Sequence, residues 1–226
     1  MNSPSALTLA TNLYDLIRAD LLASRFEPGS KLAIEAVATR YASGQTPVRE
    51  ALNRLTSEGL VERRDQRGFA VAGVSDADLV EITRTRCWLE EIALRKSIEA
   101  RTPEWEEQLV LAHHRLARTP RSLSLRKFEN NPAWEPLHRA FHRALVGNCG
   151  SRWLIGFCEQ LADQLYRYRQ LSVKRVYPKR HEHDEHQAIV DAAIAGDVDT
   201  AVALLQAHYQ RTADMIRSVP DLFAPS

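Results

Sequence analysis

The chain has 226 residues, of which 44% are hydrophobic, and its 30 basic and 29 acidic side chains leave a formal net charge of +1. This composition is typical of a soluble globular protein, and the near-neutral charge indicates no particular partner. No apolar run approaches the roughly 20 residues that span a bilayer, and the N-terminus lacks a signal-peptide pattern. Three cysteines without CxxC spacing favour free thiols in a reducing cytoplasm, so we expect a cytoplasmic protein with no membrane partner.

The first 75 residues predict three helices followed by a β-hairpin. The helices are expected over 7–24, 33–41 and 46–58, and the strands around residues 60–61 and 69–71, with a turn at 65–68. Thr46 is expected to cap the third helix, with Pro47 at its first helical position. Three helices and a hairpin make a winged helix-turn-helix, which inserts its third helix into a major groove.

Several side chains of this segment suit DNA. Arg49, in the first turn of the third helix, can pair with phosphate or a guanine edge, and Gln45 can read adenine or bond phosphate. Arg67 and Gly68, at the tip of the wing, allow a close approach of the backbone. The alternative is a small helical subdomain with solvated arginines.

From residue 76 the sequence predicts helices to its end, so the fold class is mainly α. They are expected over 76–100, 103–117, 134–147, 151–173, 178–195 and 198–217, with a polar link over 119–132. Short connections between the later helices imply antiparallel neighbours. We therefore expect a DNA-binding domain over 1–75 and an all-α antiparallel bundle over 76–226 that binds an effector and dimerises.

The stretch "LHRAFHRALVGN" places His138 and His142 one helical turn apart, on one face. His186 and His208 lie on the last two helices, each roughly 15 Å from the turn that joins them, so they should stand level. These four histidines predict a metal cluster inside the bundle. The alternative is an ordinary polar helix face.

The N-terminal run "TPVREALNRLTSEGLV" closely resembles the GntR family of bacterial transcription regulators. The resemblance implies operator DNA binding through Gln45, Thr46, Arg49 and the wing around Arg67 and Gly68. The family commonly has Val-Ser-Arg where this chain has Ser-Gly-Gln at 43–45. The lost arginine removes a cationic contact, for which Arg40 is a candidate replacement.

The rest of the chain resembles the FCD ligand-sensing domain of FadR-type GntR regulators. The resemblance rests on "R…LE…A" from Arg86, on "FHRALVGN", on "EHQAIVDAAIAGD" and on the later histidine. Many FCD domains bind a divalent metal through one aspartate and three histidines, which match His142, His186 and His208. The aspartate position is His138 here.

An all-nitrogen ligand set suits Zn or Ni better than Mg or Ca, so we expect a divalent transition metal. The alternatives are three histidines with water, or no metal. A small carboxylate is the expected effector, paired by Arg86, with Asn148 as a second candidate. Arg86 could instead form a surface ion pair with Glu90, and Asn148 could simply end a helix.

Together these features predict a ligand-responsive transcriptional regulator, a repressor that acts as a homodimer on a two-fold operator. Two alternatives remain: a metal-free effector-binding regulator and a metal-dependent hydrolase or lyase. The carboxylates beside His186 (Glu182, Asp184 and Glu185) look solvated rather than placed as a general base. We therefore expect no enzyme.

Overall fold

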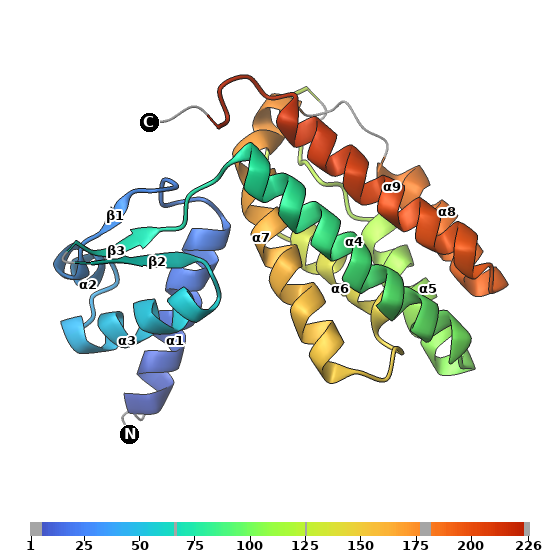
Figure 1. The fold of residues 1–226 in the computed structure, drawn as a ribbon, viewed down its shortest axis with the longest axis horizontal. Coiled ribbons are helices and arrows are strands. Elements are labelled where there is room, and N and C mark those ends of the chain that lie inside the picture. Colours follow the sequence, from blue (N-terminus) through green and yellow to red (C-terminus); the bar gives the residue numbers. More distant parts are fainter. Residues whose placement is uncertain (1–5, 66, 125, 177–181, 224–226) are drawn as a thin grey trace.

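The computed structural model describes residues 6–65, 67–124, 126–176 and 182–223, with only the backbone for 6–11. In Figure 1 an N-terminal unit of helices and a short sheet lies beside a bundle of longer helices. The fold is mainly helical, as the sequence predicts. No helix in these ranges is long and apolar enough to cross a membrane.

The N-terminal unit is a winged helix-turn-helix. Its elements are α1 (Ala6–Leu22), β1 (Lys31–Leu32), α2 (Ile34–Arg40), α3 (Gln45–Ser57), β2 (Val61–Arg64) and β3 (Gly68–Val71). The sheet has the order β1-β3-β2, and both pairs are antiparallel, with Val61 opposite Val71. The short strand β1 was not predicted, because two residues are too few to show the alternation that marks a strand.

The start of α3 differs from the prediction in one detail. Gly44, with an extended backbone, is the N-cap, and Thr46 is the second residue of the helix. Helix α3 therefore begins at Gln45, one residue earlier than expected, and Pro47 is its third residue. Proline is tolerated there because the first four N–H groups of a helix have no partner within it.

The bundle contains α4 (Asp76–Glu99), α5 (Pro103–Ala117), α6 (Trp134–Val146), α7 (Arg152–Val176), α8 (Glu182–Ala195) and α9 (Val198–Arg217). Ser75 caps α4 by accepting a hydrogen bond from the Asp78 N–H. Helix α7 runs three residues beyond its predicted end. The predicted start of α8, at residue 178, lies outside the described residues.

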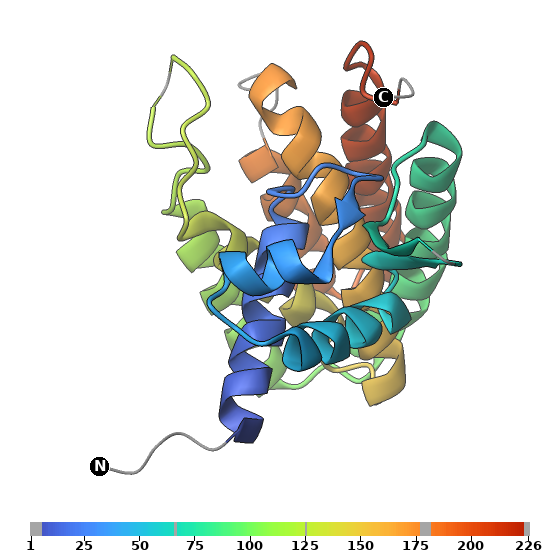
Figure 2. The same cartoon turned by 90° about the vertical axis from the view of Figure 1, so that its left-hand side faces the viewer.

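Helix α7 carries most of the contact between the two units. It packs against α1, and Tyr166 of α7 joins the core that α1 and α3 share. Gln164 donates a hydrogen bond to the backbone carbonyl of Glu58, just after α3, and Arg167 donates to that of Ala72, in the linker. Seen from the side, the N-terminal unit lies across the face of the bundle (Figure 2). The position of the recognition helix α3 therefore depends on α7.

Candidate metal centre

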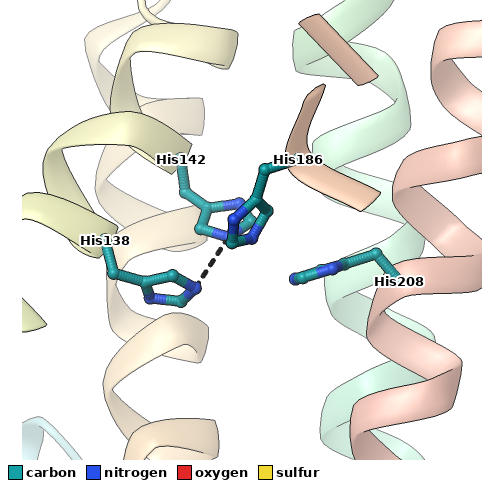
Figure 3. A group of neighbouring side chains, drawn as sticks. All are labelled: His138, His142, His186 and His208. Carbon is teal, nitrogen blue, oxygen red and sulfur yellow. Dashed lines mark hydrogen bonds between the residues drawn. The ribbon is translucent and has the colours of Figure 1, made fainter. Parts of the chain in front are cut away.

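Four buried histidines meet in the middle of the bundle. His138 and His142 come from α6, His186 from α8 and His208 from α9. Each offers one ring nitrogen, and these four atoms all lie within 4.8 Å of one another. The rings converge from three helices on one point (Figure 3). The structure thus brings together all four histidines that the sequence singled out.

The outer nitrogens of two rings are held by acceptors. His208 Nδ1 lies 2.8 Å from a carboxylate oxygen of Glu185, which can only accept, so the proton is on Nδ1. His142 Nδ1 lies 3.1 Å from the Tyr209 hydroxyl, whose own proton goes to Glu90, so Nδ1 is again the donor. In both rings Nε2 keeps its lone pair. Such outer hydrogen bonds are typical of metal-binding histidines.

His138 is held in the opposite way. Its Nδ1 lies 3.2 Å from a guanidinium nitrogen of Arg169, and a guanidinium only donates. The proton of neutral His138 is therefore on Nε2, which points at His142 Nε2 at 3.1 Å. In this arrangement Nε2 of His138 has no lone pair for a metal. A three-histidine centre of His142, His186 and His208 fits the hydrogen bonding better than a four-histidine one.

Burial keeps the central rings neutral. Loss of solvent lowers the pKa of His138 well below its ordinary value, and the charge on Arg169 lowers it further. The pKa of His142 is also lowered well below the usual range, first by burial and then by His208. Neutral imidazoles are the form that binds a metal. The donor set therefore fits a divalent transition metal.

A cavity of about 610 Å³ lies beside the histidines, and His138 and His142 form part of its wall. Its other charged side chains are balanced, with five arginines and five carboxylates. They are Arg18, Arg86, Arg139, Arg143 and Arg169, and Glu58, Glu90, Glu135, Glu159 and Asp163. Three residues of the cavity wall belong to the N-terminal unit: Arg18, Glu58 and Leu60.

Arg86 and Asn148 have different positions. Arg86 lies in the cavity wall, but its guanidinium bonds Glu90 at 2.6 Å and the Tyr209 hydroxyl at 3.1 Å. The ion pair with Glu90 thus exists, and it is buried rather than on the surface. Asn148 is not in the cavity wall; its amide donates to the Ala100 and Ser97 carbonyls at the end of α4.

The candidate DNA contacts lie on the exposed side of the N-terminal unit. Gln45, Thr46 and Arg49 are exposed in the first turns of α3, and Arg67 and Gly68 are exposed beside the hairpin turn. Gly68 has a φ of +80°, which favours glycine. Arg40 lies on α2 instead, where it bonds Asp20 at 3.0 Å and stacks 4.4 Å from the centre of the Phe26 ring.

Several residues of the centre were missed from the sequence. Glu185, expected to be solvated, is 15% exposed in its side chain and holds His208. Tyr209 and Arg169 determine two of the histidine tautomers, yet nothing in their spacing marked them. Tyr209 follows His208 directly, and adjacent residues of a helix do not face each other. Arg169 lies on a helix that contributes no histidine to the cluster.

Comparison with known proteins identifies both units. Residues 9–71 match the gntR family of bacterial regulatory proteins, and residues 81–211 match the FCD domain. The uncharacterized HTH-type transcriptional regulator BphR of Paraburkholderia xenovorans is 36% identical over 204 residues, covering 90% of this chain and 83% of that protein. The HTH-type transcriptional repressor GlaR of Escherichia coli is 32% identical over 199 residues, covering 86% and 90%.

Solved structures have the same fold. Escherichia coli McbR/YncC superposes with a TM-score of 0.73 at 22% identity, covering 96% of this chain and 98% of that one. A putative GntR regulator from Rhodococcus sp. RHA1 gives 0.70 at 19% identity, covering 94% and 99%. The relatives are transcription regulators, which excludes the hydrolase or lyase alternative. The chain belongs to the GntR family of bacterial transcription regulators and carries an FCD domain behind its DNA-binding winged helix.

Proposed function

We propose that this regulator is a repressor whose bundle binds a divalent transition metal, Zn or Ni, together with a small organic acid. Residues 1–75 bind operator DNA, and residues 76–226 bind the effector and dimerise. The observation that carries the proposal is the convergence of four buried histidines on one point beside a cavity. Imidazole donors suit these metals.

The hydrogen bonds divide the four histidines into two roles. His142, His186 and His208 are the proposed ligands, since their rings converge and the outer nitrogens of two are held by acceptors. His138 is the fourth candidate, and it can ligate through Nε2 only if Arg169 releases its Nδ1. Three histidines leave open positions that a carboxylate of the effector can occupy.

The charge of the cavity supports an anionic effector. Its arginines and carboxylates balance, so a divalent ion gives the site a net charge of about +2 when the histidines are neutral. Each carboxylate of a bound organic acid lowers that charge by one. Arg86 remains a candidate partner only if the acid competes with Glu90 for it, whereas Asn148 lies at the end of α4 and has no place in this site.

One observation favours a metal-free regulator as the second candidate. The donors and acceptors from Arg169 through His138, His142 and Tyr209 to Glu90 form a continuous series of hydrogen bonds, which needs no ion to complete it. The effector would then bind directly to the arginines of the cavity. The metal and metal-free proposals differ in the metal content of the purified protein.

Elemental analysis of untagged protein, purified without chelators, tests the metal proposal. We expect close to one zinc or nickel per chain, and a loss of at least about tenfold in affinity for His208→Ala. His114→Ala is the matched control, since His114 is exposed and lies outside the cluster. No metal after purification, and none taken up on titration, would leave the metal-free regulator.

On the DNA side, Gln45, Thr46 and Arg49 are the proposed contacts from α3, and Arg67 and Gly68 those from the wing. Their exposure and the unpaired N–H groups of the first turn of α3 suit phosphate and base edges. Arg40 is a weaker candidate, because Asp20 and Phe26 already hold its guanidinium. A two-fold pair of chains would place two such faces on a palindromic operator.

A further inference from the structure

The cavity beside the histidines does not end within the bundle. Its wall includes Arg18 of α1 and Glu58 and Leu60 at the end of α3, which belong to the DNA-binding unit. A molecule that fills the cavity therefore touches both units. Residues of the DNA-binding unit thus form part of the wall of a cavity that lies mainly in the bundle.

A chain of ion pairs follows the wall from one unit to the other. Arg18 pairs with Glu58, with a nitrogen–oxygen distance of 2.8 Å, and with one oxygen of Asp163. The other oxygen of Asp163 pairs with Arg139, which lies 3.3 Å from Glu135. Glu135 also pairs with Arg169, the residue that bonds His138. This series of ion pairs thus connects the histidine cluster with the end of the recognition helix.

Asp163 is the central link. Its side chain is 8% exposed and stands between two guanidiniums from different units, Arg18 on α1 and Arg139 on α6. Two guanidiniums that share one carboxylate form a ready site for another carboxylate. Arg18 also donates to Glu58, which is the C-cap of α3. A change in the partners of Arg18 therefore changes a contact at the end of that helix.

We propose that the cavity is an effector site shared between the units, in which Arg18 of the DNA-binding unit and Arg139 of the bundle bind one anionic group of the effector in competition with Asp163. This proposal rests on the proposed anionic effector. It adds a second anion-binding position, away from the histidines, and so specifies a dianion such as a dicarboxylic acid. Occupancy of that position alters how the DNA-binding unit is held.

The competition predicts opposite shifts for two substitutions. Asp163→Asn removes the competing carboxylate, so dicarboxylate affinity rises about tenfold. Arg18→Met removes a partner of the anion while keeping an apolar stem, so affinity falls about tenfold. Glu159→Gln is the matched control: Glu159 lies in the same wall, one turn before Asp163, but pairs with Arg143 and has no link to Arg18. The dicarboxylate affinity of Glu159→Gln should stay within about threefold of the wild-type value.

The probes are succinate, glutarate and adipate, titrated calorimetrically into the full-length chain with its metal content measured in parallel. Hydrogen–deuterium exchange of the wild type is recorded with and without the acid that binds best. We expect the acid to change exchange in residues 12–22 and 55–61, within the DNA-binding unit. A merely structural Asp163 would change stability without raising affinity for the acid.

Three results would overturn the proposal: none of the acids binds, Arg18→Met binds as the wild type does, or exchange changes only within the bundle. If Asp163→Asn does not fold, the dicarboxylate affinity of Arg18→Met, compared with that of Glu159→Gln, still tests the proposal. A chain without metal whose dicarboxylate affinity depends on Arg18 would refute the metal centre and support the shared site. A metal-loaded protein whose dicarboxylate affinity does not depend on Arg18 would support the metal centre and refute the shared site.

Discussion

Arg169 is the residue that most changes the interpretation of the histidine cluster. The spacing of four histidines suggests four equivalent ligands, yet ring nitrogens differ according to what holds them. A guanidinium next to Nδ1 of His138 fixes the proton on the nitrogen that faces the cluster. The pKa of Arg169 is itself lowered, by burial, although Glu135 opposes that shift. One cation outside the cluster therefore distinguishes His138 from His142 and His208, whose Nε2 atoms keep their lone pairs.

Replacement of Arg169 by methionine should release His138 to become a fourth ligand. Nδ1 could then carry the proton, Nε2 would present its lone pair, and a positive charge near the metal would be gone. We expect metal affinity to rise about tenfold, measured by competition with a chromophoric chelator. Arg143→Met is the control, because Arg143 lies in the same cavity wall, pairs with Glu159 and makes no contact with His138. Unchanged affinity in Arg169→Met would refute the tautomer assignment.

His113 makes a separate contribution to the pH dependence of stability. It is 6% exposed, and its Nε2 has no hydrogen-bond partner among the described residues. Burial lowers its pKa, and His183, stacked on it at 5.8 Å between ring centres, lowers it further. The folded chain therefore resists protonation of His113, whereas the unfolded chain takes up the proton below a pH of about 6.5.

It follows that the stability associated with a neutral His113 is fully present above a pH of about 6.5 and is lost as the pH falls. His113→Leu should remove this part of the loss. Between pH 7.5 and 5.5 we expect its unfolding free energy to fall less than that of the wild type, by up to about 1 kcal/mol in urea titrations. His114→Leu, at the exposed neighbouring position, should follow the wild type. Equal acid sensitivity of all three proteins would contradict this account.

Among the elements, the turn between α8 and α9 was the most predictable part of the site. Counting residues on either side of Gly196 placed His186 and His208 level, and the structure confirms that they meet. In a long, strongly periodic helix, an error of one residue in the predicted end does not change the relative positions of residues in its middle. Such counting works because the rise per residue of a helix is constant.

Other parts could not be predicted for reasons that are equally physical. Gly44 rather than the predicted Thr46 is the N-cap of α3, and side-chain preferences could not decide this because Thr and Gly are about equally favoured at that position. Arg169 and Asp163 act through contacts between distant segments, which no local pattern encodes. The sequence leaves Asn148 open as a second effector contact or as the end of a helix, because it does not show that the neighbour of Asn148 in space is the end of α4.

That contact gives α4 a measurable stabilisation. The Asn148 amide donates to the carbonyl of Ala100 at 2.6 Å and to that of Ser97 at 3.4 Å. Both carbonyls lie at the C-terminal end of α4, where a helix leaves its last carbonyls without partners of its own. Asn148→Ala should lower the unfolding free energy by about 1–2 kcal/mol, measured by urea denaturation, without changing metal affinity. Asn53→Ala, at an exposed position of α3, should stay within about 0.5 kcal/mol. If Asn148→Ala changed metal affinity, Asn148 would again be a candidate for the effector site.

At the scale of the whole molecule, exposed apolar side chains mark the expected surface of the dimer. Trp88 and Ile92 on α4 are 56% and 52% exposed, and Trp153 and Phe157 on α7 are 67% and 53% exposed. Helices α4 and α7 pack against each other, so the four side chains come from neighbouring helices of the bundle. Large exposed aromatic side chains are typical of protein–protein interfaces.

Charge on this surface should prevent dimerisation. For Trp88→Glu combined with Phe157→Glu we expect a mass of 25.6 kDa by light scattering, against twice that value for the wild type. Leu111→Glu, at a 47% exposed position of α5, should leave the dimer intact. A wild type that is already monomeric would refute the dimer, and a dimeric double variant would place its interface elsewhere.

The linker between the units limits how freely such regulators can be recombined. Arg167 holds the Ala72 carbonyl, and the Tyr168 hydroxyl accepts from the Ser75 N–H and donates to Asp78. The junction is thus fixed by a helix that lies some ninety residues further along the chain. A hybrid regulator that joins this winged helix to a foreign sensor at residue 75 would lose those anchors. Sensor exchange would therefore require Gln164, Arg167 and Tyr168 to be transferred with the DNA-binding unit, as if they were part of it.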